Sequence, residues 1–167
     1  TKGKFYAAVQ QDDQPASAEA VSVYRRKLEL NKRIYGDVNF TEFGPTSGPV
    51  APDGSADLVL FLRNIHNWMA GGLVEKAFAA AFAALKSGGT LGVEEHRAKA
   101  GSLPVPGAPS GYVLEAYVKQ VAAEAGFHFD AASEINANPK DDTDHPFGVW
   151  TLPPTRRSSE PGKPTRP

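Results

Sequence analysis

Residues 56–68 read ADLVLFLRNIHNW, and they carry the strongest fold signal in the chain. The unbroken apolar run from Leu58 to Leu62 is typical of a central parallel strand that is buried on both faces of an α/β sheet. A polar cluster, Arg63 to Trp68, follows it directly. Because ligands bind at the carboxyl ends of the strands in open α/β sheets, we expect functional side chains in this cluster.

The composition predicts one domain over residues 1–154, followed by an extended or disordered tail over 155–167 that is rich in proline and arginine. The 18 basic and 19 acidic residues give no electrostatic basis for binding nucleic acid or an anionic membrane. The chain has no cysteine, which excludes a disulfide framework and a thiol nucleophile. No apolar stretch approaches the roughly 18–20 residues that span a bilayer.

Hydrophobic periodicity and breaker residues divide the domain into alternating elements. The expected strands are residues 4–9, 38–43, 58–62, 90–93, 127–135 and 148–152, and the expected helices are residues 17–35, 73–85 and 110–125, with Ser17 and Ser110 as N-caps and Phe78 and Phe82 in the core. The alternation predicts a parallel sheet covered on both faces. The last two strands have no helix between them, which indicates an antiparallel pair with a polar tip at residues 136–146.

A parallel sheet that ends in an antiparallel pair resembles the Rossmann-like fold of class I S-adenosylmethionine-dependent methyltransferases. The segments DGSADLVL (53–60) and LKSGGTLG (85–92) resemble the entries to the fourth and fifth strands of that fold. Four further segments, RNIHNW (63–68), EHR (95–97), SEINANPK (133–140) and GVWTLPP (148–154), look like a little-characterised bacterial group of predicted methyltransferases. The resemblance implies S-adenosylmethionine as the cofactor.

The resemblance begins at the second strand of the family fold, and the first strand with its glycine-rich turn has no counterpart here. In the family's strand order the first strand lies between the second and the fourth, so its absence leaves unpaired backbone groups at the centre of the sheet. We therefore expect an upstream segment or a partner chain to complete the sheet. A rearranged sheet is the third alternative, and a continuous monomeric sheet would contradict the first two.

The resemblance also assigns residues to the cofactor. The family's second strand commonly ends in an acidic residue that accepts hydrogen bonds from the ribose hydroxyls; here Gln10 ends the strand and Asp12 follows. Phe43 and Gly44 match the adenine-contact position, and Asn64 follows the central strand. The expected cofactor-binding residues are therefore Gln10, Asp12, Phe43, Gly44 and Asn64.

His66 and Arg63 are the expected catalytic residues. Methyl transfer needs alignment and, for an oxygen or nitrogen acceptor, a base, and an ordinary histidine pKa near 6.5 suits that role. The structural alternatives are that Arg63 and Asn64 cap the strand end and the next helix, and that His66 bridges two loops.

The expected substrate-binding residues are Trp68, Glu95, His96, Asn136 and Asn138. Glu95 and His96 end the strand beside the first cluster, where they can orient His66. Trp68 is equally suited to the core, and the asparagines to a solvated turn. We expect no metal site, because two histidines and one carboxylate here match no tight metal-binding spacing.

The sequence therefore predicts an S-adenosylmethionine-dependent methyltransferase acting on a small molecule. A non-catalytic relative that binds a ligand or a partner is the alternative. A third interpretation is an NAD-linked enzyme with a Rossmann-like sheet, and the closing antiparallel pair argues against it. The compartment, periplasmic or cytoplasmic, stays open because relatives often carry export signals and a cysteine-free chain tolerates both.

Overall fold

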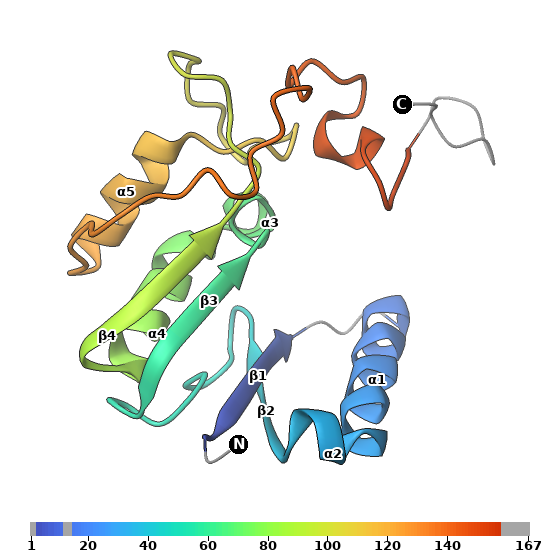
Figure 1. The fold of residues 1–167 in the computed structure, drawn as a ribbon, viewed down its shortest axis with the longest axis vertical. Helices are drawn as coiled ribbons and strands as arrows, with labels where there is room; N and C mark the ends of the chain where they lie inside the picture. The colour runs from blue at the N-terminus through green and yellow to red at the C-terminus, as the bar shows by residue number, and fades with distance from the viewer. Residues whose placement is uncertain (1–2, 12–14, 158–167) are drawn as a thin grey trace. The chain divides into compact units, whose positions relative to one another are not determined.

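The computed structural model describes residues 3–11 and 15–157 and divides into two compact parts (Figure 1). The first part contains the described residues of Thr1–Val59 together with Ala79–Thr90, and the second contains those of Leu60–Phe78 and Leu91–Pro167. The boundary crosses three elements, which are β3 (Ala56–Leu62), α4 (Val74–Ala84) and β4 (Leu85–Glu94). Asp12 and residues 158–167 of the expected tail lie outside the described residues.

The first part is built on a parallel pair of strands, β1 (Phe5–Gln10) and β2 (Val38–Phe43). Its helices are α1 (Pro15–Leu30) and α2 (Lys32–Tyr35), which replace the single helix expected from Ser17 to Tyr35. Ser17 lies inside α1 and does not cap it. The ring of Tyr24 on α1 meets the ring of Phe40 edge to face at 6.2 Å, which fixes the helix against β2.

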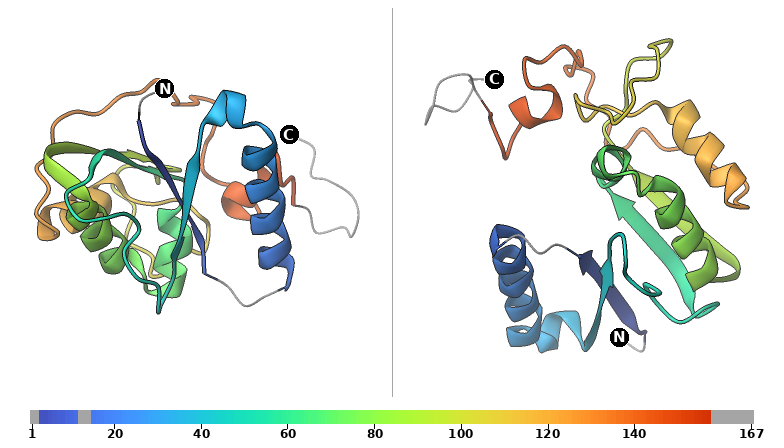
Figure 2. Two further views of the ribbon diagram at one scale, coloured as in Figure 1. Left: turned by 90° about the horizontal axis from the view of Figure 1, so that it is seen from below. Right: turned by 180° about the vertical axis from the view of Figure 1, so that it is seen from behind.

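β3 and β4 form a second two-stranded sheet, and both arrows point the same way in Figure 1. The N–H of Ser55 donates to the Ala84 carbonyl at one end, and the N–H of Arg63 donates to the Glu94 carbonyl at the other. Helix α4 covers one face of this pair (Figures 1 and 2). On that face the rings of Phe61 and Phe78 meet edge to face at 5.3 Å, and both are buried.

The other face of β3 corrects the expectation of a strand buried on both sides. Leu58, Leu60 and Leu62 alternate with the inward-facing Phe61 and are each about half exposed. Side chains on a strand alternate between its two faces. Helix α4 lies on the face that carries Phe61, so it does not cover the face that carries the leucines. An apolar run therefore marks β3 correctly as a strand, but it does not show that both faces are covered.

Three elements complete the second part: α3 (Ile65–Gly71), α5 (Glu115–Glu124) and a short 3₁₀ turn, η1 (Gly148–Thr151). The sequence did not predict α3 as a separate helix, because α3 has only seven residues before Gly72, which ends it with a left-handed backbone. The expected helix from Ser110 begins only at Glu115, with Leu114 at the N-cap position. Val113 instead forms a parallel bridge with Arg97.

The expected antiparallel strand pair was wrong. Residues 128–140 are exposed and residues 127–147 contain no strand, while the expected strand at 148–152 is replaced by η1. Gly148 has a φ of +54°, and a Cβ there would overlap the backbone of Ser110. The N–H of Val149 donates to the Ser110 carbonyl at 2.8 Å. This close approach of two backbones replaces strand pairing with a tight turn.

The described residues form two separate two-stranded sheets. We expected an upstream segment or a partner chain to supply the strand that joins the two pairs, and only a continuous sheet would have contradicted this. That expectation therefore stays a prediction. The mixed α/β class with parallel strand pairs is confirmed. Among the described helices none is long and apolar enough to cross a bilayer.

Phe78 and Phe82, both expected in the core, differ in burial. Phe78 is 0 % exposed and Phe82 is 50 % exposed, although both lie on α4. We expect Phe78→Ala to lower the free energy of unfolding by about 3–5 kcal/mol, because a buried ring is removed and a cavity is left. Phe82→Ala, the matched control, should cost at most about 1 kcal/mol. Urea titration followed by circular dichroism measures both, and equal losses would contradict the packing of α4.

Candidate active site

The site is built where β3 and β4 end. β3 ends at Leu62, and Arg63 takes a left-handed backbone with a φ of +58° that turns the chain into α3. Such a conformation is uncommon for a residue with a side chain and tends to mark functional positions. The turn carries His66 to the second residue of α3, next to Glu95, which follows β4.

The carboxylate of Glu95 accepts three hydrogen bonds. Its Oε1 accepts from His66 Nδ1 at 2.9 Å and from the N–H of His96 at 2.9 Å, and its Oε2 accepts from the N–H of His66 at 3.3 Å. The side chains of His66 and Glu95 are only 7 % and 6 % exposed. Three donors therefore replace the water that this carboxylate loses on burial.

This geometry orients the imidazole of His66. An ionised carboxylate can only accept, so His66 Nδ1 carries the hydrogen in the bond to Glu95. In the neutral ring the other nitrogen, Nε2, then has a lone pair that can accept a proton. A base held by a carboxylate in this way is the arrangement that activates hydroxyl and amine groups in enzymes.

Aromatic rings surround the pair. The ring centroid of His66 lies 5.8 Å from that of Trp150 and 6.1 Å from that of His96, and the ring centroid of Tyr112 lies 6.1 Å from that of His96. Burial lowers the pKa of His96 below its usual range; Glu95 opposes that shift, while His66 and Arg63 add to it. His96 is therefore held neutral beside the pair near pH 7.

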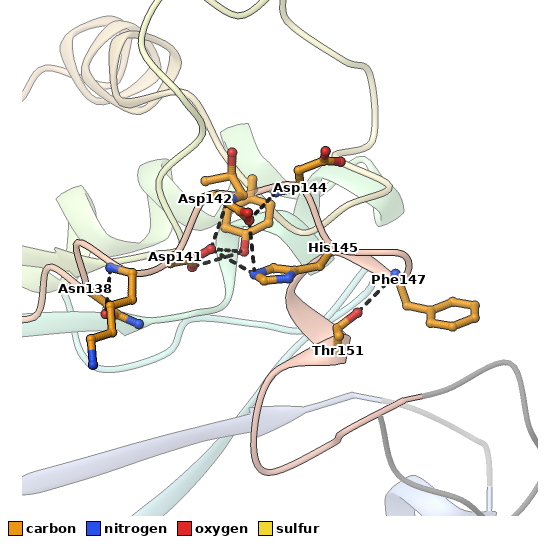
Figure 3. Close-up of polar contacts among 10 residues, drawn as sticks. Asn138, Asp141, Asp142, Asp144, His145, Phe147 and Thr151 are labelled. Atoms are coloured by element: carbon orange, nitrogen blue, oxygen red, sulfur yellow. Dashed lines mark hydrogen bonds and ion pairs between the residues drawn. The ribbon is translucent and has the colours of Figure 1, made fainter. Parts of the chain in front are cut away.

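A second polar cluster lies beyond Tyr112 (Figure 3). The Tyr112 hydroxyl donates to Asp141 at 2.8 Å, and His145 Nε2 and the N–H of Thr143 donate to the same carboxylate at 3.0 and 2.9 Å. Burial raises the pKa of Asp141, but these donors outweigh burial and hold it below its usual range. Burial, followed by the bond to Asp141, raises the pKa of Tyr112, whose hydroxyl therefore stays protonated.

The same cluster contains donor atoms of the types that bind metal ions. Asp141, Asp142 and His145 each offer one atom, and the three atoms lie within 4.8 Å of one another. The carboxylate of Asp141 already accepts from Tyr112, Thr143 and His145, and Asp142 is largely exposed. Hydrogen bonding accounts for this cluster without an ion.

The structure brings together five residues that the sequence singled out: Arg63, Asn64, His66, Glu95 and His96 follow the ends of the two neighbouring strands β3 and β4. The guanidinium Nε of Arg63 lies 3.9 Å from the carboxylate of Glu94, and the group is half exposed. Asn64 Oδ1 accepts from the N–H of Leu62 at 2.8 Å, so its side chain caps the end of β3. The structural alternative raised for Asn64 therefore holds for the strand end, while its side chain makes no cap hydrogen bond to α3.

The other expected substrate-binding residues have different surroundings. Trp68 meets the ring of Phe61 edge to face at 4.8 Å, so it contributes to the core of the second part. Asn136 and Asn138 are exposed, and Asn138 Oδ1 accepts from the N–H of Lys140, which forms a local turn (Figure 3). The hairpin tip that was expected to carry them does not form.

In the first part, the expected cofactor residues gather at the carboxyl end of the β1–β2 pair. Gln10 and Phe43 are opposite each other in the register, and Gly44 follows. A Cβ on Gly44 would lie 2.5 Å from the Cβ of Gln11, so only glycine fits there. Gln11, which the sequence did not single out, accepts hydrogen bonds at Oε1 from both the N–H and the hydroxyl of Thr46.

Sequence reasoning missed Tyr112 and Trp150 as neighbours of the histidines. Tyr112 follows a proline-rich loop and was expected within a helix, and Trp150 was expected in a strand. Their positions depend on the bridge between Arg97 and Val113 and on the docking of η1 on Ser110, which no local pattern signals.

Comparisons of this chain with protein-family models, with curated proteins and with solved structures found no match in any of the three. The functional proposal therefore rests on the geometry of the site and on the resemblance of the short segments.

The lowered pKa of His96 predicts how stability depends on pH. In the unfolded chain His96 has its ordinary pKa of about 6.5, so its imidazole binds a proton more readily there than in the folded protein. The free energy of unfolding therefore falls as the pH decreases from about 7 to 5. We expect His96→Gln to lose less stability over that interval than the wild type.

Urea midpoints measured at pH 7.5 and pH 5 check this expectation. The control is His128→Gln, at an exposed histidine, which should keep the pH dependence of the wild type. An unchanged pH dependence in His96→Gln would contradict the assignment.

Proposed function

We propose that this chain is an S-adenosylmethionine-dependent methyltransferase domain that acts on a small-molecule acceptor. The observation that carries the proposal is the buried His66–Glu95 pair, which follows the ends of the paired strands β3 and β4. That edge is where α/β sheets bind their ligands. The segments RNIHNW (63–68) and EHR (95–97), which resemble the methyltransferase group, supply this pair.

In the proposed reaction the cofactor supplies a methyl group bound to a positively charged sulfur. His66 Nε2 removes the proton from an acceptor oxygen or nitrogen, and Glu95 stabilises the imidazolium that forms. Arg63, half exposed and anchored beside Glu94, faces the acceptor. The neutral balance of charge favours a small molecule over nucleic acid as acceptor.

The residues expected to hold the cofactor fit its chemistry in part. The strand ends at Gln10, Phe43 and Gly44 offer an amide, an aromatic ring and a glycine at a close approach of two backbones, which suit an adenosine group. Asn64 uses its amide oxygen to cap β3 and retains its N–H₂ donors. A carboxylate for the ribose hydroxyls would have to come from Asp12.

We further infer that the two parallel pairs belong to one Rossmann-like methyltransferase sheet. Its joining strand would be supplied from outside the described residues. The closing antiparallel pair, which argued against an NAD-linked enzyme, does not form, so cofactor preference has to be measured directly.

A non-catalytic ligand-binding domain is the second candidate, and one observation favours it. The side chain of His66 is only 7 % exposed, and a buried pair of this kind can also serve to lock α3 to the end of β4. A protein with this role would bind a ligand but transfer no methyl group.

Calorimetric titration with S-adenosylhomocysteine, with NAD as the control ligand, tests the cofactor class. We expect one site with a dissociation constant in the micromolar range, which corresponds to about −8 kcal/mol. NAD should give no heat of binding. Binding of NAD in place of S-adenosylhomocysteine, or binding of neither, would overturn the proposal.

Variants of the pair test its catalytic role. In an assay with methyl-labelled cofactor and a panel of phenols and amines, His66→Gln should lower turnover about 10²–10⁴-fold. Glu95→Gln should shift the pH profile because the orienting charge is lost. S-adenosylhomocysteine binding should stay unchanged in both.

The exposed-histidine variant His128→Gln is the matched control and should keep full turnover. Full turnover in His66→Gln would remove the base from the mechanism. A parallel loss of cofactor binding would instead indicate a structural role for the pair.

A further inference from the structure

A cavity of the second part has a volume of about 440 Å³ and is lined by Tyr112, whose ring lies beside His96. Its walls come from α3, the start of α4, the loop 98–112, the start of α5 and Thr143. This volume falls within the range of 300–1,000 Å³ that is usual for small-molecule sites. Neither Arg63, His66 nor Glu95 lines this cavity.

The loop that forms one wall is closed at its base. The N–H of Ala98 donates to the Val113 carbonyl, and the N–H of Val113 donates to the His96 carbonyl, both at 2.8 Å. Pro104, Pro106 and Pro109 restrict the backbone between these ends. A loop with a pinned base and restricted dihedrals keeps its shape, which reduces the entropic cost of holding a ligand.

The lining is mainly apolar, and part of it is left open to solvent. Val74, Val113 and Tyr112 are buried and line the cavity, while Leu103 and Val105 on the loop line it with 84 % and 55 % of their surface exposed. Exposed aliphatic side chains beside a buried apolar floor mark surface that a ligand can remove from water.

Charge in the lining is balanced. Glu75 and Lys99 are the charged lining residues, one of each sign, and both are exposed. The remaining side-chain polarity comes from the hydroxyl groups of Ser102, Ser110, Tyr112, Tyr117 and Thr143. This combination favours a neutral molecule with few polar groups, because the lining has no net charge to compensate an ion for its lost hydration.

The cavity connects with the proposed catalytic pair through shared residues. Tyr112 lines the cavity and packs against His96, whose ring packs against His66. Met69 lines the cavity from α3, three residues after His66 and therefore on the same side of that helix. The rings of Tyr112 and His96 would thus separate a molecule in the cavity from His66.

We propose that this cavity binds a neutral, largely apolar small molecule at a site separate from the catalytic pair. This binding follows from the cavity itself and does not rest on the proposed function.

Fluorescence titration with N-phenylnaphthylamine, a neutral aromatic amine that brightens in apolar surroundings, tests the binding on the full chain. We expect saturable binding with a micromolar dissociation constant. Leu103→Asp should weaken it about tenfold, since an apolar contact is replaced by a hydrated charge. Val105→Asp, at a second loop position, should act in the same direction.

The matched control is Ile135→Asp. Ile135 is 87 % exposed, a fraction similar to that of Leu103, but it does not line the cavity. Probe binding should therefore stay at the wild-type level. Absence of saturable binding, or equal weakening by Leu103→Asp and Ile135→Asp, would overturn the proposal. Anilinonaphthalene sulfonate, the anionic analogue, should bind more weakly, and tighter binding would overturn the neutral class.

These outcomes are separate from those of the methyltransferase test, because the probe titration needs no cofactor. Probe binding without S-adenosylhomocysteine binding would retain the cavity as a ligand site and reject the methyltransferase. S-adenosylhomocysteine binding without probe binding would retain the methyltransferase proposal and reject the cavity as a ligand site.

Discussion

The burial of one carboxylate, that of Glu95, constrains the second part of the molecule. A buried charge is costly unless it is paired and hydrogen-bonded, and Glu95 meets this requirement with the ring and backbone N–H of His66 and the backbone N–H of His96. The start of α3 must therefore lie against the end of β4. The left-handed turn at Arg63 is what allows the chain to reach that position within three residues.

A continuous set of packed groups extends from this pair. The ring of His96 packs against the rings of His66 and Tyr112. The Tyr112 hydroxyl donates to Asp141, whose carboxylate also accepts from His145. The bridge between Arg97 and Val113 holds the base of the loop 98–112, so the same residues that position Tyr112 also shape the apolar cavity. The Arg97–Val113 bridge therefore holds both the loop that lines the cavity and Tyr112, whose ring packs against His96 beside the proposed base.

Local sequence patterns predicted the elements best where the elements are self-contained. β2 has the expected bounds, β3 contains the expected run, and the helical stripe of α4 was recognised within one residue at each end. The polar groups after β3 and β4 were also placed correctly as neighbours, because the ends of paired parallel strands meet at one edge. Prediction failed at residues 127–135 and 148–152, where apolar residues suggested strands but no strand among the described residues pairs with their backbone groups.

The order of residues alone was enough to specify an α/β protein and to single out His66, Glu95 and His96, because composition and period are local properties. Only the tertiary structure decided that Glu95 is buried on His66, that Asn64 caps β3 and that Trp68 packs in the core. It also decided that the closed loop and Tyr112 enclose a cavity. These outcomes depend on contacts between segments far apart in the chain, whose geometry is set by burial and hydrogen bonding together rather than by the preference of any one segment.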